Sequence, residues 1–338
     1  MDIENRKATL LSEEMKRGIR EELNIDPDSE LLNPTVDYVF KRIFTADEKE
    51  AKAALIDFIN SILEHEKDDR IVDLTIANPQ IPVDRGKEKK SVFDIRARYN
   101  NGRQAIIEMQ KDPAPGFKKR AQHIISKAYG RQEISGSGYD SLEKNYLICI
   151  TCFDVIKESG EYIKDYRFRD RQGVDLSDDN TIVFLDLTKI DKVLDKQVDK
   201  MTNVEKWAVF FKYATDKSKR ELLRKIIETK AGIGMAAKIL MEVSKDEEAR
   251  AYYESELIFE LDQIGRYNQA KREGIDLGRE QTEERYEAEI AKIEKTHEAE
   301  KIESVKKLIA LGLTADQISA AMQMEIPHIE NIKKEFDL

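Results

Sequence analysis

Short apolar segments in the first part of the chain have the length and alternation of β-strands. Residues 92–99 and 104–110 alternate between apolar and polar side chains, whereas YLICITCF (146–153) and TIVFLDL (181–187) are continuous apolar runs. Alternation is typical of a strand with one buried face, and a short continuous run is typical of a strand buried on both faces. With a further segment at 71–77, the pattern predicts five strands.

Helical spacing of apolar residues occurs before the first strand and between the third and fourth strands. We expect a helix that begins near Asn33 and Pro34, a second over about 47–64 and a third over about 117–135. The first of these helices has an inward face made of Val36, Phe40, Ile43 and Phe44. This order of elements predicts an α/β sandwich with a mixed sheet over residues 31–190.

Strand signals stop after about residue 190, and the rest of the chain has helical patterns. We expect a helical domain at 191–265, one long charged helix at 266–302 and a small helical module at 303–338. Apolar positions are sparse along the long helix, so an isolated helix and an oligomerisation stalk are both open. The last module breaks at Gly312, with a spacing that suits a helix-turn-helix DNA-binding unit or a small cap or dimerisation unit. Residues 1–30 are expected to form an N-terminal helical arm.

Composition bears on the partners and the compartment of the protein. Of the 338 residues, 37% are charged, well above the roughly 25% average, and the net charge is −10. No global basic field draws the chain to nucleic acid, so a nucleic-acid partner needs a local basic patch. Because no apolar run reaches about 20 residues and only two cysteines occur, we expect a soluble, cytoplasmic protein.

The stretch VFDIRARYNNGRQAIIEMQK (92–111) predicts a β-hairpin whose register decides where two acids lie. A two-residue turn would place each of the acids, Asp94 and Glu108, opposite an apolar residue and would mix both faces of the sheet. A three-residue loop at 100–102 puts Gly102 in the left-handed conformation that such loops need and makes one face apolar. The pairs on that face are Phe93 with Met109, Ile95 with Ile107 and Ala97 with Ala105. Since a buried face fixes register strongly, we expect the three-residue loop.

The favoured register places Asp94 directly opposite Glu108. The side-chain roots of such a pair lie roughly 4.5–5.5 Å apart, and like charges there are destabilising. A bound divalent cation removes the repulsion, and carboxylate oxygens are hard ligands of the kind that Mg²⁺ prefers. Neutralisation by Arg96 or Arg98 on a solvated face is the alternative.

Several motifs together resemble a known nuclease family. An Asp on one strand followed by Glu-x-Gln on the next and then by a helix resembles the PD-(D/E)XK nuclease superfamily. The segments DYVFKRIF, NPQIP, IEMQ and GFKKRAQHIISKAYGRQ, in this order, resemble its Rpn recombination-promoting nuclease and PD-(D/E)XK nuclease family transposase group. The resemblance covers about residues 31–190 and implies a restriction-endonuclease-like core, a mixed sheet flanked by helices.

The resemblance also implies roles for individual residues. Asp94 and Glu108 would ligate Mg²⁺ or another divalent ion, and Gln110 stands where most of the superfamily has a catalytic lysine. Asp37, on the first helix, would complete the metal shell directly or through water. Its alternative role is an (i, i+4) salt bridge to Lys41.

Basic residues near the acids are candidates for DNA contacts. By resemblance, Arg120 and Gln132 are implied to contact phosphate, with a helix-surface role as the alternative; Lys118 and Lys119 extend the same basic run. The cation that replaces the missing motif lysine is left open among Lys111, Lys118, Lys119 and Lys127. Such phosphate contacts would give salt-sensitive, sequence-tolerant binding.

The Cys149-x-x-Cys152 pattern carries little chemistry in this context. It lies in a continuous apolar strand, where residues three apart face opposite sides, which is poor geometry for a shared metal. We therefore expect structural thiols.

These features lead to one main hypothesis and one alternative. The main hypothesis is a Mg²⁺-dependent endodeoxyribonuclease that hydrolyses phosphodiester bonds in recombination, mobile-element biology or defence against foreign DNA. The alternative is a catalytically inactive DNA-binding or assembly protein that keeps the nuclease scaffold and associates through its C-terminal helices.

Overall fold

The computed structural model describes most of the chain. The described residues are 30–46, 49–64, 70–77, 80–81, 91–92, 94–99, 102–132 and 138–336. The chain divides into two compact units, the first ending at Ile258 and the second covering Phe259–Leu338. Except for Glu30, the predicted N-terminal arm lies outside the described residues, as do Phe93 and the loop residues Asn100 and Asn101.

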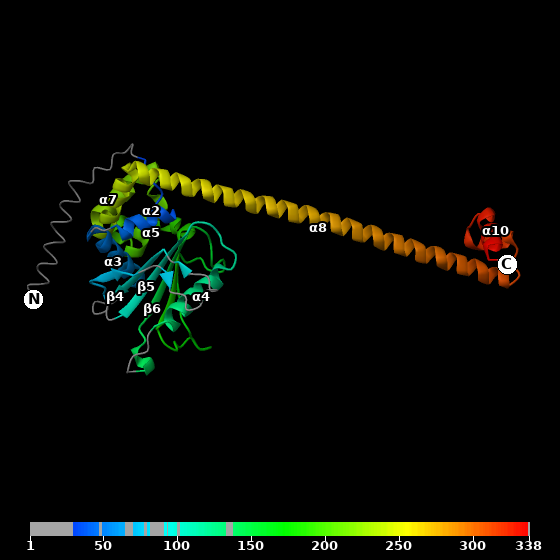
Figure 1. The fold of residues 1–338 in the computed structure, drawn as a ribbon, viewed down its shortest axis with the longest axis horizontal. Coiled ribbons are helices and arrows are strands. Elements are labelled where there is room, and N and C mark those ends of the chain that lie inside the picture. The colour runs from blue at the N-terminus through cyan, green and yellow to red at the C-terminus, as the bar shows by residue number, and fades with distance from the viewer. Residues whose placement is uncertain are drawn as a thin grey trace, which may run out of the picture. The chain divides into compact units, whose positions relative to one another are not determined.

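A six-stranded mixed sheet forms the centre of the first unit (Figure 1). In spatial order its strands are β1 (Leu74–Ile76), β4 (Ile95–Tyr99), β5 (Arg103–Gln110), β6 (Asn145–Thr151), β8 (Asn180–Asp186) and β7 (Ile163–Tyr166). The pairs β5–β6 and β6–β8 are parallel, and the other three pairs are antiparallel. The mixed sheet expected from the sequence is therefore confirmed.

Two strands had no signal in the sequence. The edge strand β7 has the sequence IKDY and is mostly exposed, so it lacks the apolar alternation that marks the inner strands. The short strand β2 (Gln80–Ile81) pairs with β3 (Ser91–Val92) in a separate two-stranded sheet.

Helices cover both faces of the large sheet and create two cores (Figure 1). The first core lies against α2 (Asp37–Thr45), α3 (Lys49–Leu63), α5 (Asn203–Tyr213), α6 (Arg220–Thr229) and α7 (Ala231–Lys245). The second core lies under the single helix α4 (Phe117–Gly130), which links the parallel strands β5 and β6. Within β5, Ile107 points into the first core and Ile106 into the second, which follows from strand alternation.

The predicted first helix begins later than expected. Asn33 does not cap it; its side chain accepts hydrogen bonds from the backbone and hydroxyl of Thr35, and helix α2 begins at Asp37. A turn closed by the Val36 N–H and the Asn33 carbonyl precedes the helix. The local preference of Asn for turns therefore outweighs its use as a cap here.

The helices after residue 190 share one core with the sheet. Trp207 of α5 packs on Phe58 of α3, with ring centroids 5.3 Å apart, and its indole N–H donates to Asp57 at 3.0 Å. Lys230, just before α7, also contacts Asp57, at 2.8 Å. Although we predicted a boundary near residue 190, residues on both sides of it pack together because the first sheet face needs a second layer of helices. Short 3₁₀ helices connect these elements: η2 (Gly138–Ser141), η3 (Leu187–Val193), η4 (Val198–Lys200) and η5 (Lys217–Lys219).

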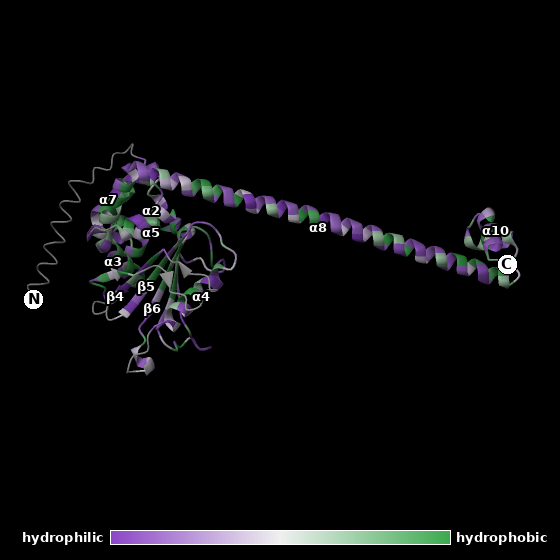
Figure 2. Cartoon of the chain, in the orientation of Figure 1, coloured by the Kyte–Doolittle hydropathy of each residue, from purple (hydrophilic) through white to green (hydrophobic). Residues whose placement is uncertain are grey.

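The long charged helix extends further than expected in both directions. Helix α8 covers Glu247–Ala310, whereas the prediction was 266–302. Its residues are predominantly hydrophilic with scattered hydrophobic ones (Figure 2). No helix among the described residues is both long enough and apolar enough to cross a membrane.

The last residues form a small helical core of their own. Helices α9 (Ala315–Met322) and α10 (Ile326–Glu335) pack with the end of α8 around Val305, Ile318, Ile329 and Ile332. Gly312 has φ of 84°, which confirms the break in the chain there. Thr314 and Gln317 form a capping box at the start of α9.

Candidate active site

The hairpin has the register expected from its apolar residues. Tyr99 pairs with Arg103, and Ile95 pairs with Ile107. Gly102 has φ of 106°, a left-handed conformation that glycine adopts without strain. The three-residue loop is therefore confirmed, and the predicted pairing of Phe93 lies outside the described residues.

This register brings Asp94 and Glu108 together at the edge between β4 and β5. Asp94 directly precedes β4, and one further step of the ladder places it opposite Glu108. Its Oδ2 accepts a hydrogen bond from the Met109 backbone N–H at 2.7 Å. The Glu108 side chain is only 1% exposed, so its charge lies in a poorly hydrated place.

A third acid and a lysine reach the pair from α2. Lys41 Nζ lies 2.6 Å from Asp37 Oδ2 and 3.5 Å from Asp94 Oδ1. The salt bridge that was the alternative role of Asp37 is thus present, but the same lysine also contacts the acid of the hairpin. Sequence patterns alone do not place Lys41 beside Asp94, because this contact depends on how α2 packs against the sheet.

Helix α4 adds a second cation from the opposite side. Arg120 Nη2 lies 2.9 Å from Glu108 Oε2. Lys41 thus pairs with Asp94, and Arg120 pairs with Glu108. The Arg96 guanidinium instead donates to Gln104 at 2.9 Å. The neutralising cations are therefore not those considered from the hairpin sequence.

Burial raises the pKa of both carboxyl groups. Burial, and then the charges of Glu108 and Asp37, raise the pKa of Asp94 to about 8. Burial raises the pKa of Glu108 to about 7, although the charges of Arg120 and Lys41 oppose the change. Burial alone would lower the pKa of Lys41, but its contacts with Asp37 and Asp94 raise it above its ordinary value.

Two carboxylate oxygens of this cluster have no partner. Asp37 Oδ1 and Glu108 Oε1 are buried and accept no hydrogen bond. Buried oxygens without a donor are costly, and a divalent cation or its bound water would satisfy them. Among the described residues, no group of three or more His, Cys, Asp or Glu side chains is arranged to hold a metal ion. The cluster therefore fits a divalent cation with few protein ligands and several waters, as Mg²⁺ commonly has.

Comparison with known families gives one match, which covers the site and its scaffold. The family described as PD-(D/E)XK nuclease family transposase matches residues 34–270. The chain belongs to this family. Comparisons with curated proteins and with solved structures found no match. Membership supports a nuclease-like or transposase-related function, in a family whose nucleases generally use divalent metals.

The family match extends well past the predicted nuclease domain. It ends within α8 and so includes α5, α6 and α7. This range agrees with the shared core, in which those helices cover one face of the sheet. The unit that carries the site in this PD-(D/E)XK family member is therefore larger than residues 31–190.

The remaining candidate residues of this PD-(D/E)XK family member differ in their contacts and exposure. Gln110 lies two residues after Glu108 on the same face of β5, and its amide donates to the Met109 carbonyl at 3.0 Å. The Gln132 amide bonds to both backbone groups of Glu143, each at 2.7 Å, and so ties the end of α4 to the segment before β6. Lys118 and Lys119 are exposed on the first turns of α4.

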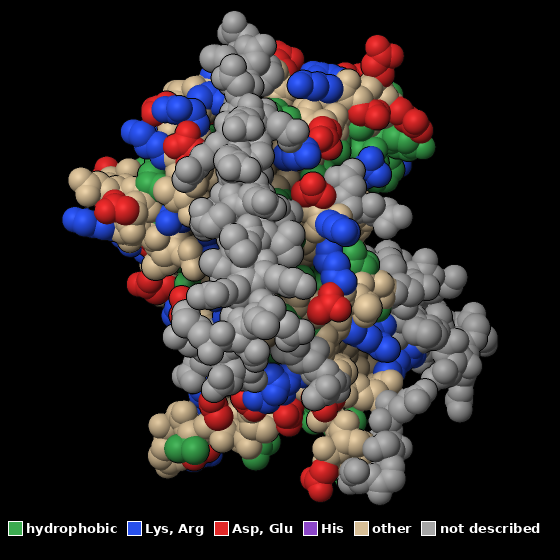
Figure 3. Space-filling view, turned by 90° about the vertical axis from the view of Figure 1, so that its left-hand side faces the viewer, with side chains coloured by type: hydrophobic (Ala, Val, Ile, Leu, Met, Phe, Trp, Pro, Cys, Tyr) green, Lys and Arg blue, Asp and Glu red, His purple; other side chains and the backbone are tan. Residues whose placement is uncertain are grey.

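The two cysteines are placed as expected for structural thiols. Cys149 is buried in the second core, Cys152 packs against the first, and neither forms a disulfide. Burial raises the pKa of both thiols. On the face drawn in Figure 3, the visible acidic and basic side chains are interspersed, so that face has no continuous basic area among its coloured residues.

Proposed function

We propose that this protein is a metal-dependent endodeoxyribonuclease that hydrolyses phosphodiester bonds of DNA with Mg²⁺ or a related divalent ion. One observation carries the proposal: the buried carboxylate of Glu108 has one oxygen on Arg120 and the other without a partner, next to Asp94. The two carboxylates are buried, repel each other and lack some of their hydrogen bonds. A bound cation would remove the repulsion and give the unpaired oxygen a partner.

Asp94 and Glu108 would hold the ion, with Asp37 beside them on α2. When bound, a divalent ion polarises the scissile phosphate and lowers the pKa of a water molecule. The raised pKa values of Asp94 and Glu108 mean that the empty site keeps protons near neutral pH, so that binding releases them.

Lys41 would supply the positive charge that a motif lysine supplies in most of the superfamily. Its ammonium group contacts two carboxylates of the cluster, and the side chain is still 34% exposed, so a substrate phosphate can approach it. Gln110 has no charge and cannot stabilise developing negative charge as an ammonium does. Its amide can hydrogen bond, so its proposed role is to orient the attacking water. Lys118, Lys119 and Arg120 remain proposed phosphate contacts on α4, together with Gln132.

A second candidate function has a specific observation in its favour. Lys41 and Arg120 already pair with the carboxylates, and the described acids form no ready three-ligand metal set. A catalytically inactive DNA-binding or assembly protein that keeps the nuclease scaffold would tolerate such a self-neutralised cluster. Self-association through the C-terminal helices and a role in recombination, mobile-element biology or defence remain predictions under either function.

Plasmid cleavage separates the two candidates. Purified protein is incubated with supercoiled plasmid and Mg²⁺, alongside Asp94→Ala and a matched control, Glu161→Gln, which removes an exposed acid far from the cluster. We expect nicking or linearisation by the wild type and the control but not by Asp94→Ala. Equal cleavage by Asp94→Ala would contradict the proposal, whereas metal-independent DNA binding without cleavage over a range of divalent ions would favour the second function.

A further inference from the structure

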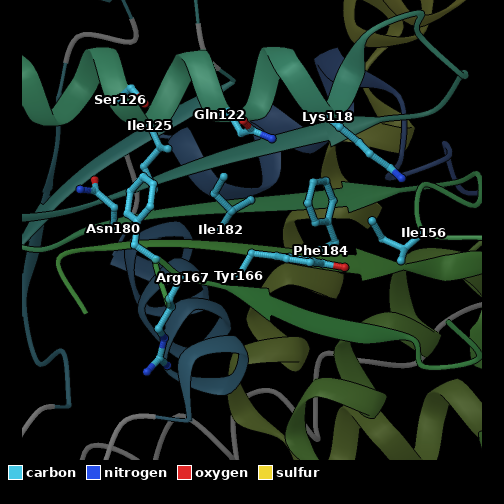
Figure 4. A pocket seen from close by; sticks show the side chains of 11 residues that line it. Lys118, Gln122, Ile125, Ser126, Ile156, Tyr166, Arg167, Asn180, Ile182 and Phe184 are labelled. Carbon is cyan, nitrogen blue, oxygen red and sulfur yellow. The ribbon is translucent and has the colours of Figure 1, made fainter. Parts of the chain in front are cut away.

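A cavity lies on the second face of the sheet, separate from the carboxylate cluster. It has a volume of about 260 Å³, just below the roughly 300–1,000 Å³ typical of small-molecule sites. Helix α4 bounds it on one side, β8 lies beneath it, and β7 with the residues after it forms the other side (Figure 4). The cavity has room for one compact ligand.

The cavity and the carboxylate cluster lie on opposite flanks of the same helix. Lys118, Gln122 and Ile125 line the cavity, whereas Arg120 faces Glu108. An α-helix with its side chains is about 10–12 Å wide. One bound strand is long enough to contact both flanks.

Aromatic side chains give this cavity surfaces for a flat ring. Phe168 is 63% exposed and Tyr166 is 40% exposed, which is unusual for large apolar side chains beside a cavity. Tyr166 lies edge-on to Phe184, with ring centroids 5.9 Å apart, and Ile182 adds to the apolar floor. No aromatic ring of the described residues packs against Phe168. Its face is therefore available for stacking.

The polar groups of the cavity come from α4, from Asn180 of β8 and from Arg167 after β7. Lys118 and Gln122 point toward the cavity from this helix, above Ile182 and Phe184 (Figure 4). Lys118 has no ion pair within the part of the chain that the structure describes, and the exposed Gln122 amide has no hydrogen bond there. Arg167 also lines the cavity, but Asp165 and Asp175, each at 3.3 Å, neutralise it. One unpaired cation, the Gln122 amide and the Asn180 amide, whose carbonyl oxygen accepts no hydrogen bond, thus line the cavity together with the apolar and aromatic surface.

We propose that this cavity binds a single nucleotide unit, with its base against Tyr166 and Phe168 and its phosphate at Lys118. A base can stack on an exposed aromatic face, and such stacking, together with positive charge for the backbone, is how single-stranded nucleic-acid sites bind. The Gln122 amide offers a donor and an acceptor to the polar edge of a base. The unit is a free nucleotide or an unpaired nucleotide of a DNA strand, and only the second source rests on the proposed function.

Binding measured without metal tests this proposal independently of cleavage. Full-length protein in EDTA is titrated calorimetrically with the four deoxynucleoside 5′-monophosphates and with the matching nucleosides. Labelled single-stranded and blunt duplex oligonucleotides are titrated by fluorescence anisotropy. Phe168→Ala should weaken binding of nucleotides or of the single strand about tenfold or more, and Phe168→Tyr should restore it. Lys118→Ala should remove the preference for nucleotide over nucleoside.

Two control variants and the comparison of free nucleotides with single-stranded DNA decide the outcome. Tyr267→Ala and Lys245→Ala remove an exposed aromatic ring and an exposed cation elsewhere, and binding should be unchanged in both. Binding of monophosphates identifies a free-nucleotide site, and binding of the single strand alone identifies a strand contact. Unchanged affinity in Phe168→Ala and Lys118→Ala, or no binding of any of these ligands at millimolar concentration, overturns the proposal. Asp94→Ala should bind like the wild type, so a failed nuclease assignment leaves this test intact.

Discussion

The Arg120 guanidinium lies 2.9 Å from the Glu108 carboxylate and joins α4 to β5 across the second face of the sheet. Glu108 is almost completely buried, whereas the Arg120 side chain is 46% exposed. The pair therefore has one partner that cannot be hydrated and one that can. Removal of Arg120 leaves a buried carboxylate without its nearest cation, and the energetic result depends on whether that carboxylate is charged.

Arg120→Ala should destabilise the protein in a pH-dependent manner. Breaking a fully buried ion pair costs about 3–5 kcal/mol, and the exposure of Arg120 reduces the expected loss to about 1–2 kcal/mol at pH 8. At pH 5 Glu108 is protonated in both proteins, so the difference should shrink. Urea unfolding at both pH values measures it. An equal loss at pH 5 and pH 8 would show that Arg120 acts through packing rather than charge.

The carboxyl pair should make the metal-free protein less stable as the pH rises. The folded-state pKa values of Asp94 and Glu108 lie above their ordinary values, so the folded state binds more protons than the unfolded state between about pH 4 and pH 8. Stability from these groups is complete below the unfolded pKa and is lost as the pH passes the folded pKa. Asp94→Asn removes one titrating group. In EDTA, the wild type should therefore lose more unfolding free energy than Asp94→Asn between pH 5 and pH 8, and an equal loss in both proteins would contradict this assignment.

Mg²⁺ should stabilise the protein more at pH 8 than at pH 6. An ion that binds the ionised carboxylates must displace protons, so its apparent affinity rises until both groups have lost them. A ligand that binds only the folded state raises the melting temperature, and at a fixed ligand concentration the rise is larger when the affinity is higher. Thermal unfolding with and without Mg²⁺ at both pH values measures this, with Glu161→Gln as the control and Glu108→Gln as the variant that should lose the effect. A shift that is the same at both pH values, or that persists in Glu108→Gln, would place the ion elsewhere.

Lys41 should affect cleavage and ion binding in opposite directions. Its ammonium contacts Asp37 and Asp94, so Lys41→Gln removes a charge that repels a bound cation and that would stabilise a substrate phosphate. We expect tighter Mg²⁺ binding and DNA cleavage that is slower by about 100-fold, a loss similar to that of one preorganised electrostatic contact. Lys41→Arg should recover part of the cleavage. Weaker Mg²⁺ binding in Lys41→Gln would show that the lysine only positions the acids.

Local alternation was sufficient to predict the hairpin, because a buried apolar face allows one register. The pairs of β4 and β5 and the left-handed Gly102 follow from residues that are close in the sequence. The convergence of Asp37 and Lys41 on Asp94 cannot be predicted from neighbouring residues, since it depends on the packing of α2 against the first core. The family resemblance predicts Arg120 as a phosphate contact, but its pairing with Glu108 depends on the placement of α4.

The limits of the helical region and the edge of the sheet were harder to predict for two physical reasons. Strand β7 is exposed, so its polar sequence carries no alternation. The predicted boundary near residue 190 rested on a change from strand to helix patterns, but Trp207 and Phe58 lie on opposite sides of it and pack together. A change of secondary structure is therefore a poor guide to a domain boundary when one sheet face still lacks its covering layer.

Deletion of Asn101 should abolish Mg²⁺ binding by changing the hairpin register. Strand β5 is held by seven parallel pairs with β6, so a shorter loop forces β4 to slide rather than β5. A slide of one residue turns Ile95 out of the first core and moves Asp94 away from Glu108. Insertion of one alanine at the same point is the matched control, because a longer loop can absorb the extra residue without moving either strand. The deletion variant should lose the Mg²⁺-induced rise in melting temperature and the insertion variant should keep it. Mg²⁺ stabilisation in a folded deletion variant would mean that the ion does not depend on the opposition of Asp94 and Glu108.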